Sequence, residues 1–451
     1  MIEFSRITRG SWFRPAAIVG GLLVVALMVP FIVPLRDYIP EVIATASLKI
    51  GQPVNVADMR LKILPTPRVT LYGIEVGKGA PLEIDELQVV PALFSLLGEH
   101  KAIRLIRADG VRIREPALAI VGKLPKSNKG QEGAPAVRIE SLELRDVSFQ
   151  TRAMKVPDFD LWVDLTDRYA PKSARFRTGD RALEVALEPL AQGGARVVLD
   201  AHNWKLPFRS APLTFESLVA NGTLKDGILD FPEMKGTLYG GTLTGTFRLD
   251  WLRNWRLEGR ADIARIDLSP MLRDLGKPGK LSGRLNAKAV FSSHAGTAGQ
   301  LGDALALDAP AEVTGGAWHG VDLSRVVELP FGKLPAGGKT PFEELRGTVS
   351  LRGKTLRVDE ICARSPTLVA GGNAEVAPDN ALSGELDVSV AKTGGIVGVP
   401  VALGGTVSEP SIGLTRAATI GAVLGTLVLP GVGTTLGATA GGKLATKSGC
   451  K

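Results

Sequence analysis

The sequence predicts a mainly β fold: a single N-terminal transmembrane helix followed by an elongated, curved antiparallel β-sheet with a few short helices. Three observations support this fold class. A long uncharged apolar segment lies near the N-terminus, later segments alternate between apolar and polar residues, and glycine recurs at mid-strand positions. A period of two places successive side chains on opposite sides of a strand, so the sheet should have one apolar face and one polar face.

Residues 16–35 form the predicted membrane anchor. The 21 residues between Arg14 and Arg36 carry no charge. At about 1.5 Å per helical residue, such a segment can cross roughly 30 Å of hydrocarbon. Arg6 and Arg9 precede it together with Arg14. This excess of positive charge predicts a cytoplasmic N-terminus, with the bulk of the chain on the outer side of the membrane.

A cleaved signal peptide is the alternative interpretation of this segment. Such a peptide has a shorter apolar region, with a small-residue cleavage site directly behind it. Here Pro30, Phe31 and Pro34 occupy that position. The composition therefore favours a retained anchor.

Two short helices and several strands are predicted between the anchor and residue 121. Residues 41–51 resemble an amphipathic helix that ends at a Gly-Gln-Pro sequence. Strands are expected at 54–63, 68–76, 82–89, 103–105 and 111–114. Residues 91–98 begin with proline and end with glycine, which predicts a second helix. We expect this helix to close the membrane-proximal end of the sheet through Leu93, Phe94, Leu96 and Leu97, although a plain core helix would bury the same residues.

Changes in composition predict the domain organisation. The predicted segments are a cytoplasmic stub and anchor (1–36), an N-terminal domain (37–121), a linker (122–136), a repetitive β domain (137–415) and an apolar tail (416–451). The linker is rich in Gly, Lys, Pro, Ser and Asn and has few large apolar residues. The tail is rich in Gly and Thr, and we expect a helical cap or a membrane-touching segment there.

Residues 255–263 show the strand alternation most clearly, because their odd-numbered positions are apolar or small and their even-numbered positions are charged. We expect an inner apolar face that contains Leu243, Phe247, Leu249, Trp255, Leu257, Ile263, Leu285, Val349, Leu351, Leu386 and Val388. The outer face should contain Arg256, Glu258, Arg260, Arg284, Arg346, Arg352 and Glu385. Residues 266–272 and 321–327 each follow a strand and should begin a short helix, the first with Ser269 as its cap.

Five glycines belong to the apolar face: Gly245, Gly259, Gly283, Gly347 and Gly384. Glycine in the middle of a strand normally weakens it, so a repeated glycine needs an explanation. One interpretation is that these glycines allow the sheet to curl. The other is that a row of missing side chains opens a furrow on the apolar face. Both interpretations require a strongly bent sheet.

No catalytic, metal or cofactor site is predicted. The four histidines, His100, His202, His294 and His319, lack the spacing of metal ligands. Residues 338–340 (GKT) imitate the end of a phosphate-binding loop, but the preceding glycine is misplaced. We therefore expect a protein that is not an enzyme and uses no cofactor.

The cysteines and the charges limit the function further. Cys362 and Cys450 are too few for a disulfide framework and too far apart for a metal motif, which leaves one disulfide or two free thiols. The formal net charge is +8, but Lys and Arg alternate with Asp and Glu along most segments. Because the basic residues form no patch, no nucleic-acid partner is expected.

Several short segments resemble the AsmA family of Gram-negative envelope proteins. They are 51–56 (GQPVNV), 64–71 (LPTPRVTL), 92–97 (ALFSLL), 236–245 (GTLYGGTLTG), 320–323 (GVDL), 342–348 (FEELRGT) and 405–410 (GTVSEP). The resemblance implies a single-pass bacterial inner-membrane protein with its bulk in the periplasm. It also implies a taco-like β-groove, related to bridge-like lipid-transfer proteins, whose lining would be the inner-face residues and the five glycines.

The resemblance implies a lipid as partner and a role in phospholipid transfer and outer-membrane biogenesis or maintenance. The 91–98 helix would then frame a lipid entrance. Outer-membrane or periplasmic proteins are further expected partners. The alternative function is a scaffold or assembly factor that regulates insertion of proteins into the outer membrane, using exposed sheet edges to pair with its clients.

Overall fold

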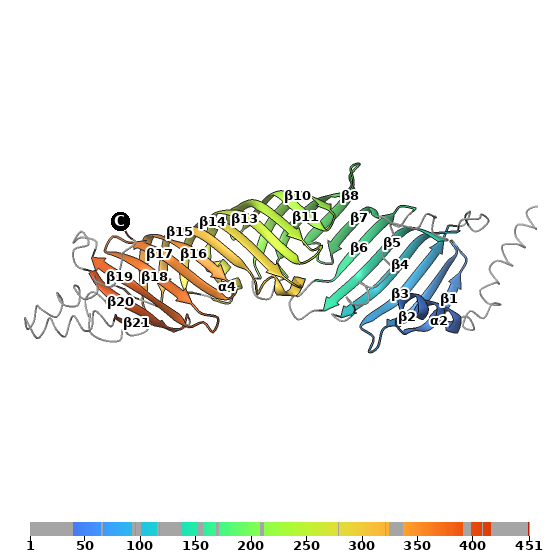
Figure 1. Cartoon of the computed structure of the whole chain (residues 1–451), viewed down its shortest axis with the longest axis horizontal. Coiled ribbons are helices and arrows are strands. Elements are labelled where there is room, and N and C mark those ends of the chain that lie inside the picture. Colours follow the sequence, from blue (N-terminus) through green and yellow to red (C-terminus); the bar gives the residue numbers. More distant parts are fainter. Residues whose placement is uncertain are drawn as a thin grey trace, which may run out of the picture. The chain divides into compact units, whose positions relative to one another are not determined.

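The structure is a computed structural model. It describes residues 39–64, 66–92, 95, 101–114, 117, 137–150, 157–167, 171–207, 212–277, 279–320, 322–323, 337–390, 398–407, 409–415 and 450. These residues are mainly β, with 21 strands assigned to an open sheet and few helices (Figure 1). The predicted fold class is confirmed to this extent. No helix among the described residues is long and apolar enough to cross a membrane. The predicted anchor at 16–35 lies outside the described residues.

The chain divides into two compact units. Unit 1 contains residues 1–181 and 186–189, and unit 2 contains residues 182–185 and 190–451. Strand β8 (Leu183–Pro189) is shared between them. The domain boundaries proposed from composition stay predictions, and the proposed linker at 122–136 lies outside the described residues.

Unit 1 holds the first seven strands. They are β1 (Val54–Lys62), β2 (Arg68–Val76), β3 (Leu82–Pro91), β4 (Lys101–Arg114), β5 (Val137–Gln150), β6 (Phe159–Leu165) and β7 (Pro171–Thr178). Neighbours in sequence pair antiparallel, except that β4 and β5 pair in parallel from Lys101 opposite Val137 to Arg114 opposite Gln150. The prediction of a wholly antiparallel sheet is therefore wrong at this point. A parallel pair needs a long connection back to the starting end, and residues 115–136 supply its length.

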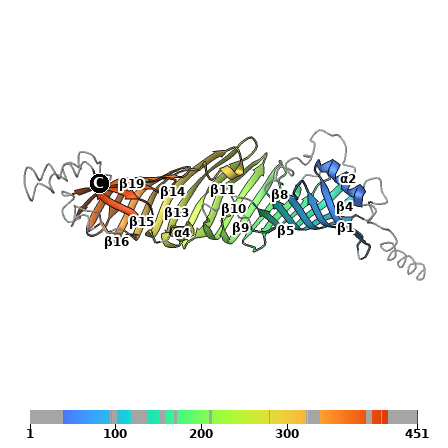
Figure 2. The same cartoon turned by 90° about the horizontal axis from the view of Figure 1, so that it is seen from below.

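Helix α2 (Ile39–Ile50) covers one face of the first strands of unit 1 (Figure 2). Ile39, Ile43, Ala46 and Ile50 recur at three- or four-residue spacing, so they lie on one side of the helix. All four pack against a core whose buried members are Val54, Val56, Met59, Leu71, Ile74 and Val76. The helix agrees with the predicted element at 41–51, but it begins two residues earlier.

The predicted second helix is wrong at its start. Pro91 is the last residue of β3 and lies opposite Ile103, so it ends a strand and does not begin a helix. A proline can end a strand because the missing N–H is lost only at the boundary of the ladder. Leu93, Phe94, Leu96 and Leu97 lie outside the described residues, so their packing stays a prediction.

Unit 2 holds the strands from β9 onward. They are β9 (Ala195–Lys205), β10 (Thr214–Lys225), β11 (Ile228–Leu238), β12 (Gly241–Asp250), β13 (Trp255–Asp267), β14 (Leu281–Ala295), β15 (Ala306–His319), β16 (Lys339–Arg352), β17 (Thr355–Arg364), β18 (Leu368–Val376), β19 (Leu382–Val390), β20 (Gly398–Gly405) and β21 (Pro410–Leu414). Each strand pairs antiparallel with the next along the chain. The connections therefore alternate between the two ends of the strands.

Among the described residues of unit 2, two short helices lie between strands. Helix α4 (Leu268–Asp274) follows β13, and the 3-10 helix η3 (Ala298–Gln300) follows β14. The prediction of a short helix after residue 266 is confirmed, but its cap is Asp267, whose Oδ1 accepts a hydrogen bond from the Ser269 amide at 2.9 Å. Ser269 lies two residues after the cap, inside the first turn, so its amide needs an acceptor and the Asp267 carboxylate provides it.

Candidate functional site

One face of unit 2 is apolar across nine consecutive strands. The residues that lie opposite one another from β11 to β19, which we call the apolar row, are Phe231, Phe247, Gly259, Phe291, Leu307, Leu351, Leu356, Val376 and Leu382. Directly opposed residues in an antiparallel pair project to the same side of the sheet. The register therefore joins strands that are more than 100 residues apart in sequence into one surface.

The predicted inner residues lie on the same side as the apolar row. Leu243 lies opposite Ile263, Leu249 opposite Leu257, and Leu307 opposite Leu351. Trp255 lies two residues before Leu257 on β13, and Val349 lies two residues before Leu351 on β16. On β19, Leu386 and Val388 lie two and four residues beyond Gly384. Leu386 and Val388 are buried, whereas Leu243, Phe247, Leu249 and Leu257 are only half-buried.

A β-bulge keeps this face apolar where the simple alternation would break. Ile263 lies opposite Ala287, but Ile266 lies opposite Leu285, so β13 carries one extra residue between these two pairs. Arg265 has a φ of 58° there. The bulge returns Ile266 and Leu285 to the apolar side. Ile266 is consequently among the most deeply buried side chains of the unit, at 1% exposure.

The opposite face carries ion pairs in contact with solvent. Arg256, Glu258, Arg260, Arg284, Arg346, Arg352 and Glu385 are all exposed. Arg352 pairs with Asp308 at 2.7 Å, and this guanidinium lowers the pKa of the Asp308 carboxyl. Exposed pairs of this kind contribute little to stability. A solvated surface accounts for these charges, as the alternation predicts.

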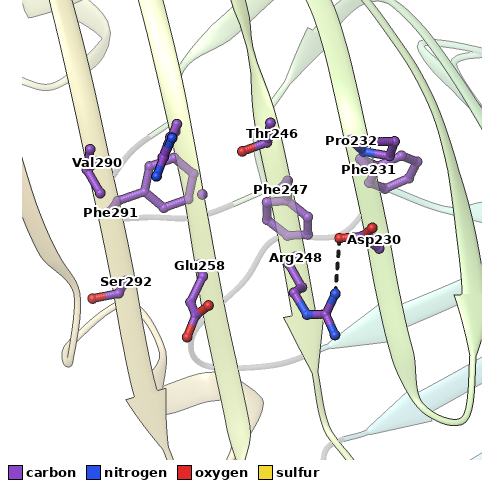
Figure 3. Close-up of a pocket in the computed structure, with 12 residues that line it drawn as sticks. Asp230, Phe231, Pro232, Thr246, Phe247, Arg248, Glu258, Val290, Phe291 and Ser292 are labelled. Carbon is purple, nitrogen blue, oxygen red and sulfur yellow. Dashed lines mark ion pairs between the residues drawn. The ribbon is translucent and has the colours of Figure 1, made fainter.

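Three phenylalanines meet on the apolar row at β11, β12 and β14 (Figure 3). The rings of Phe231 and Phe247 have centroids 6.3 Å apart at an interplanar angle of 48°. The ring of Phe291 lies over Gly259 of the strand between. A pocket of about 540 Å³ is lined here by residues of both faces of β11–β14, including the Asp230–Arg248 ion pair at 3.5 Å.

The five glycines do not leave empty space on this face. A Cβ added at Gly259 would overlap the Phe291 ring, and one added at Gly283 would lie 2.7 Å from Val313 Cγ1. At Gly245 and Gly384 it would overlap the backbone carbonyl of a neighbouring strand, and at Gly347 it would lie 3.1 Å from Val358 Cγ1. Contacts this close are expected where strands crowd together on the inside of a bend. They favour curvature over an open furrow as the role of these glycines.

The two ends of the strands in unit 2 form two rims, and one hydrogen bond joins them. Lys277 precedes β14 at one rim, and Asn380 lies in the β18–β19 turn at the other rim, because β14 and β18 run in the same direction. The Lys277 ammonium nevertheless donates to Asn380 Oδ1 at 2.5 Å. This contact brings the segment before β14 and the β18–β19 turn together, although they belong to opposite ends of strands four places apart.

Helix α4 is fixed to its rim by a small polar network. Asp274 Oδ2 accepts hydrogen bonds from the Tyr239 hydroxyl at 2.7 Å and the Thr214 hydroxyl at 2.9 Å. The hydrogen bond from Tyr239 lowers the pKa of Asp274, and burial raises the pKa of the Tyr239 hydroxyl. The helix packs Leu268, Met271 and Leu272 against Val313 and other residues of the apolar face. It therefore covers one margin of that face.

The cysteines form a disulfide, which settles the alternative left open by the sequence. Cys362 is bonded to Cys450, 88 residues later, with Cα atoms 5.1 Å apart. Cys362 lies opposite Arg346, so the bridge lies on the charged side of the sheet. The disulfide therefore attaches residue 450 near Gly371 without occupying the apolar face.

No metal centre is found among the described residues, since no group of three or more His, Cys, Asp and Glu side chains converges there. A charge cluster on β4 and β5 contains the Arg107–Glu143 pair at 2.7 Å beside Asp109, and burial raises the pKa of the Asp109 carboxyl. Each acid in this cluster has an arginine beside it, so the cluster is best explained as part of the sheet surface.

Comparison with protein-family models matches residues 208–356 to the AsmA family. This segment contains β10 to β16 and with them much of the apolar row and α4. Comparison with curated proteins and with solved structures found no match.

Proposed function

We propose that this chain, an AsmA-family protein by its match over residues 208–356, binds lipid acyl chains on the apolar face of unit 2. Its role would be in phospholipid transfer and in outer-membrane biogenesis or maintenance. The observation that carries the proposal is the register of β11 to β19, which extends a single apolar row across nine strands.

The exposure of this face gives a physical reason for a lipid ligand. Phe247, Leu249, Leu257 and Phe291 are only half-buried, although all four are large and apolar. Transfer of apolar area out of water is favourable by about 25 cal/mol per Å², so an acyl chain laid along these side chains would stabilise both partners. The bond between Lys277 and Asn380 would then close part of the binding surface from the solvent side.

The location we propose is the bacterial inner membrane, with the N-terminus in the cytoplasm and the bulk in the periplasm. The uncharged segment 16–35 and the arginines before it support this orientation. The Cys362–Cys450 disulfide supports an oxidising compartment. We also propose that the protein is not an enzyme and works without a cofactor.

Lipid bound to the purified full-length protein tests the proposal, with one apolar residue from each face of unit 2 as a matched pair. Phe291 belongs to the apolar row, whereas Val219 of β10 is 42% exposed and lies opposite Lys235 on the other face. Phe291→Asp should remove most copurified phospholipid, measured by mass spectrometry. The reason is that a carboxylate placed against acyl chains loses its hydration, which is unfavourable. Val219→Asp should leave the lipid content unchanged. Thermal melting of both variants establishes that they are folded.

Two results would contradict lipid binding. One is a wild-type protein without lipid, and the other is equal lipid loss in both variants. Crosslinks from sheet edges to outer-membrane barrel proteins in cells, without bound lipid, would favour the scaffold function instead.

A further inference from the structure

The loop between β12 and β13 places an exposed leucine between two stacked tryptophans at the margin of the apolar face. The rings of Trp251 and Trp255 have centroids 6.0 Å apart and an interplanar angle of 25°. Leu252 between them is 62% exposed, and Arg253 and Asn254 are exposed beside it. We call residues 251–255 the tryptophan lip.

The lip is continuous with the candidate lipid surface. Trp255 begins β13 and lies two residues before Leu257, so its indole projects to the apolar side. Trp251 stacks on it from the end of β12. The lip therefore lies where the apolar face meets the rim, at the end of the strands opposite to α4.

The exposed leucine is held in place by its loop. The Trp251 amide donates to the Gly227 carbonyl at 3.1 Å, and the Leu252 amide donates to Asp250 Oδ1 at 3.0 Å. On one side Leu252 packs so close to Gly227 that a Cβ there would lie 2.8 Å from Leu252 Cγ. A leucine ordered in this way but left exposed loses little conformational entropy when it binds a partner.

From this arrangement we infer that the tryptophan lip docks on a phospholipid bilayer surface, where lipid enters or leaves the apolar face. The inference rests on the proposed function. Tryptophan prefers the boundary between headgroups and acyl chains, because its ring is apolar while its N–H needs a polar partner. Leu252 would enter the acyl region, and the Arg253 guanidinium would bind a lipid phosphate through paired N–H donors.

Vesicle binding by the full-length protein in lipid nanodiscs tests this inference. The acceptor vesicles contain phosphatidylethanolamine and phosphatidylglycerol with brominated acyl chains, which quench tryptophan fluorescence on contact. The wild type should be quenched. Leu252→Ser should weaken vesicle binding about tenfold, as expected for the loss of one leucine side chain buried in the bilayer. The separate variant Arg253→Gln should also weaken vesicle binding, because the contact with a lipid phosphate is lost.

Val290→Ser is the matched control, because Val290 is 55% exposed but lies on the opposite face; its vesicle binding should equal that of the wild type. Wild-type binding by both lip variants would overturn the inference, as would a protein partner that binds the lip without vesicles. Copurified lipid, measured on the same variants, separates the two proposals. Lip variants that lose vesicle binding but keep a normal lipid content support docking of the tryptophan lip on the bilayer. A wild type that binds vesicles but contains no lipid contradicts only the proposed function.

Discussion

Strands β1–β3 in unit 1 and β11–β14 in unit 2 have similar sequence patterns but different surroundings. Helix α2 lies on the apolar face of β1–β3, where Ile74 and Val76 are 6% and 4% exposed. On β12 and β13, Phe247, Leu249 and Leu257 stay half-buried, and the described helix α4 reaches only the margin of the face. The comparison shows that an apolar strand face is a core in one region and an accessible surface in the other.

The largest expected effect is in the covered region. Ile74→Ala should lower the free energy of unfolding by about 2–4 kcal/mol, because it leaves a cavity beneath α2 that the sheet cannot fill. Urea unfolding followed by circular dichroism would measure this loss. A loss below about 1 kcal/mol would mean that α2 does not form a core with β1–β3.

A smaller loss is expected where the sheet of unit 2 bends. Gly283→Ala should cost about 1–3 kcal/mol, because Gly283 has a φ of 127° and an added Cβ would press on Val313. The control is Gly302→Ala, since no atom lies within 4 Å of a Cβ at that position. A Gly283 variant with normal stability and no bound lipid would restore the furrow interpretation.

In the open region, truncation should cost little stability. Phe247→Ala should lower the free energy of unfolding by about 1–2 kcal/mol, less than Ile74→Ala, because part of the Phe247 side chain is already in contact with water. The same variant should lose bound phospholipid, which mass spectrometry would quantify. If Phe247→Ala destabilises the protein as much as Ile74→Ala, the apolar row is a core and the difference between the two regions disappears.

The stability contributed by the contacts of α4, at the margin of the open region, should depend on pH. The pKa of Asp274 is lowered in the folded protein by the Tyr239 hydrogen bond, so its contribution to stability is complete above its unfolded pKa of about 3.9. This contribution is lost as the pH falls through the lower folded value. Urea midpoints should therefore show Asp274→Asn less stable than the wild type at pH 7, with the difference shrinking below about pH 4. The control is the exposed Asp262→Asn, whose urea midpoint at pH 7 should stay close to that of the wild type.

Local pattern was sufficient to predict several elements of the chain, although the strands expected at 103–105 and 111–114 are one strand, β4. The alternation at residues 255–263 predicts the two faces of β13 because side-chain direction in a strand depends only on the parity of the position. Helix α2 was predicted within two residues, since its apolar spacing and the glycine after it are local signals. The Asp267 cap and the strand end at Pro91 were missed because helix and strand boundaries depend on contacts beyond the boundary residue.

The candidate surface could be predicted only in part. The sequence alone determined which residues are apolar on each strand, and it determined an uncharged segment long enough for an anchor. Only the tertiary structure decided that Phe291 fills the space above Gly259, that Lys277 reaches Asn380, and that Cys450 bonds to Cys362. Side-chain direction repeats every two residues and is encoded locally. These contacts depend instead on register and on twist accumulated over many strands, so no short stretch of sequence contains them.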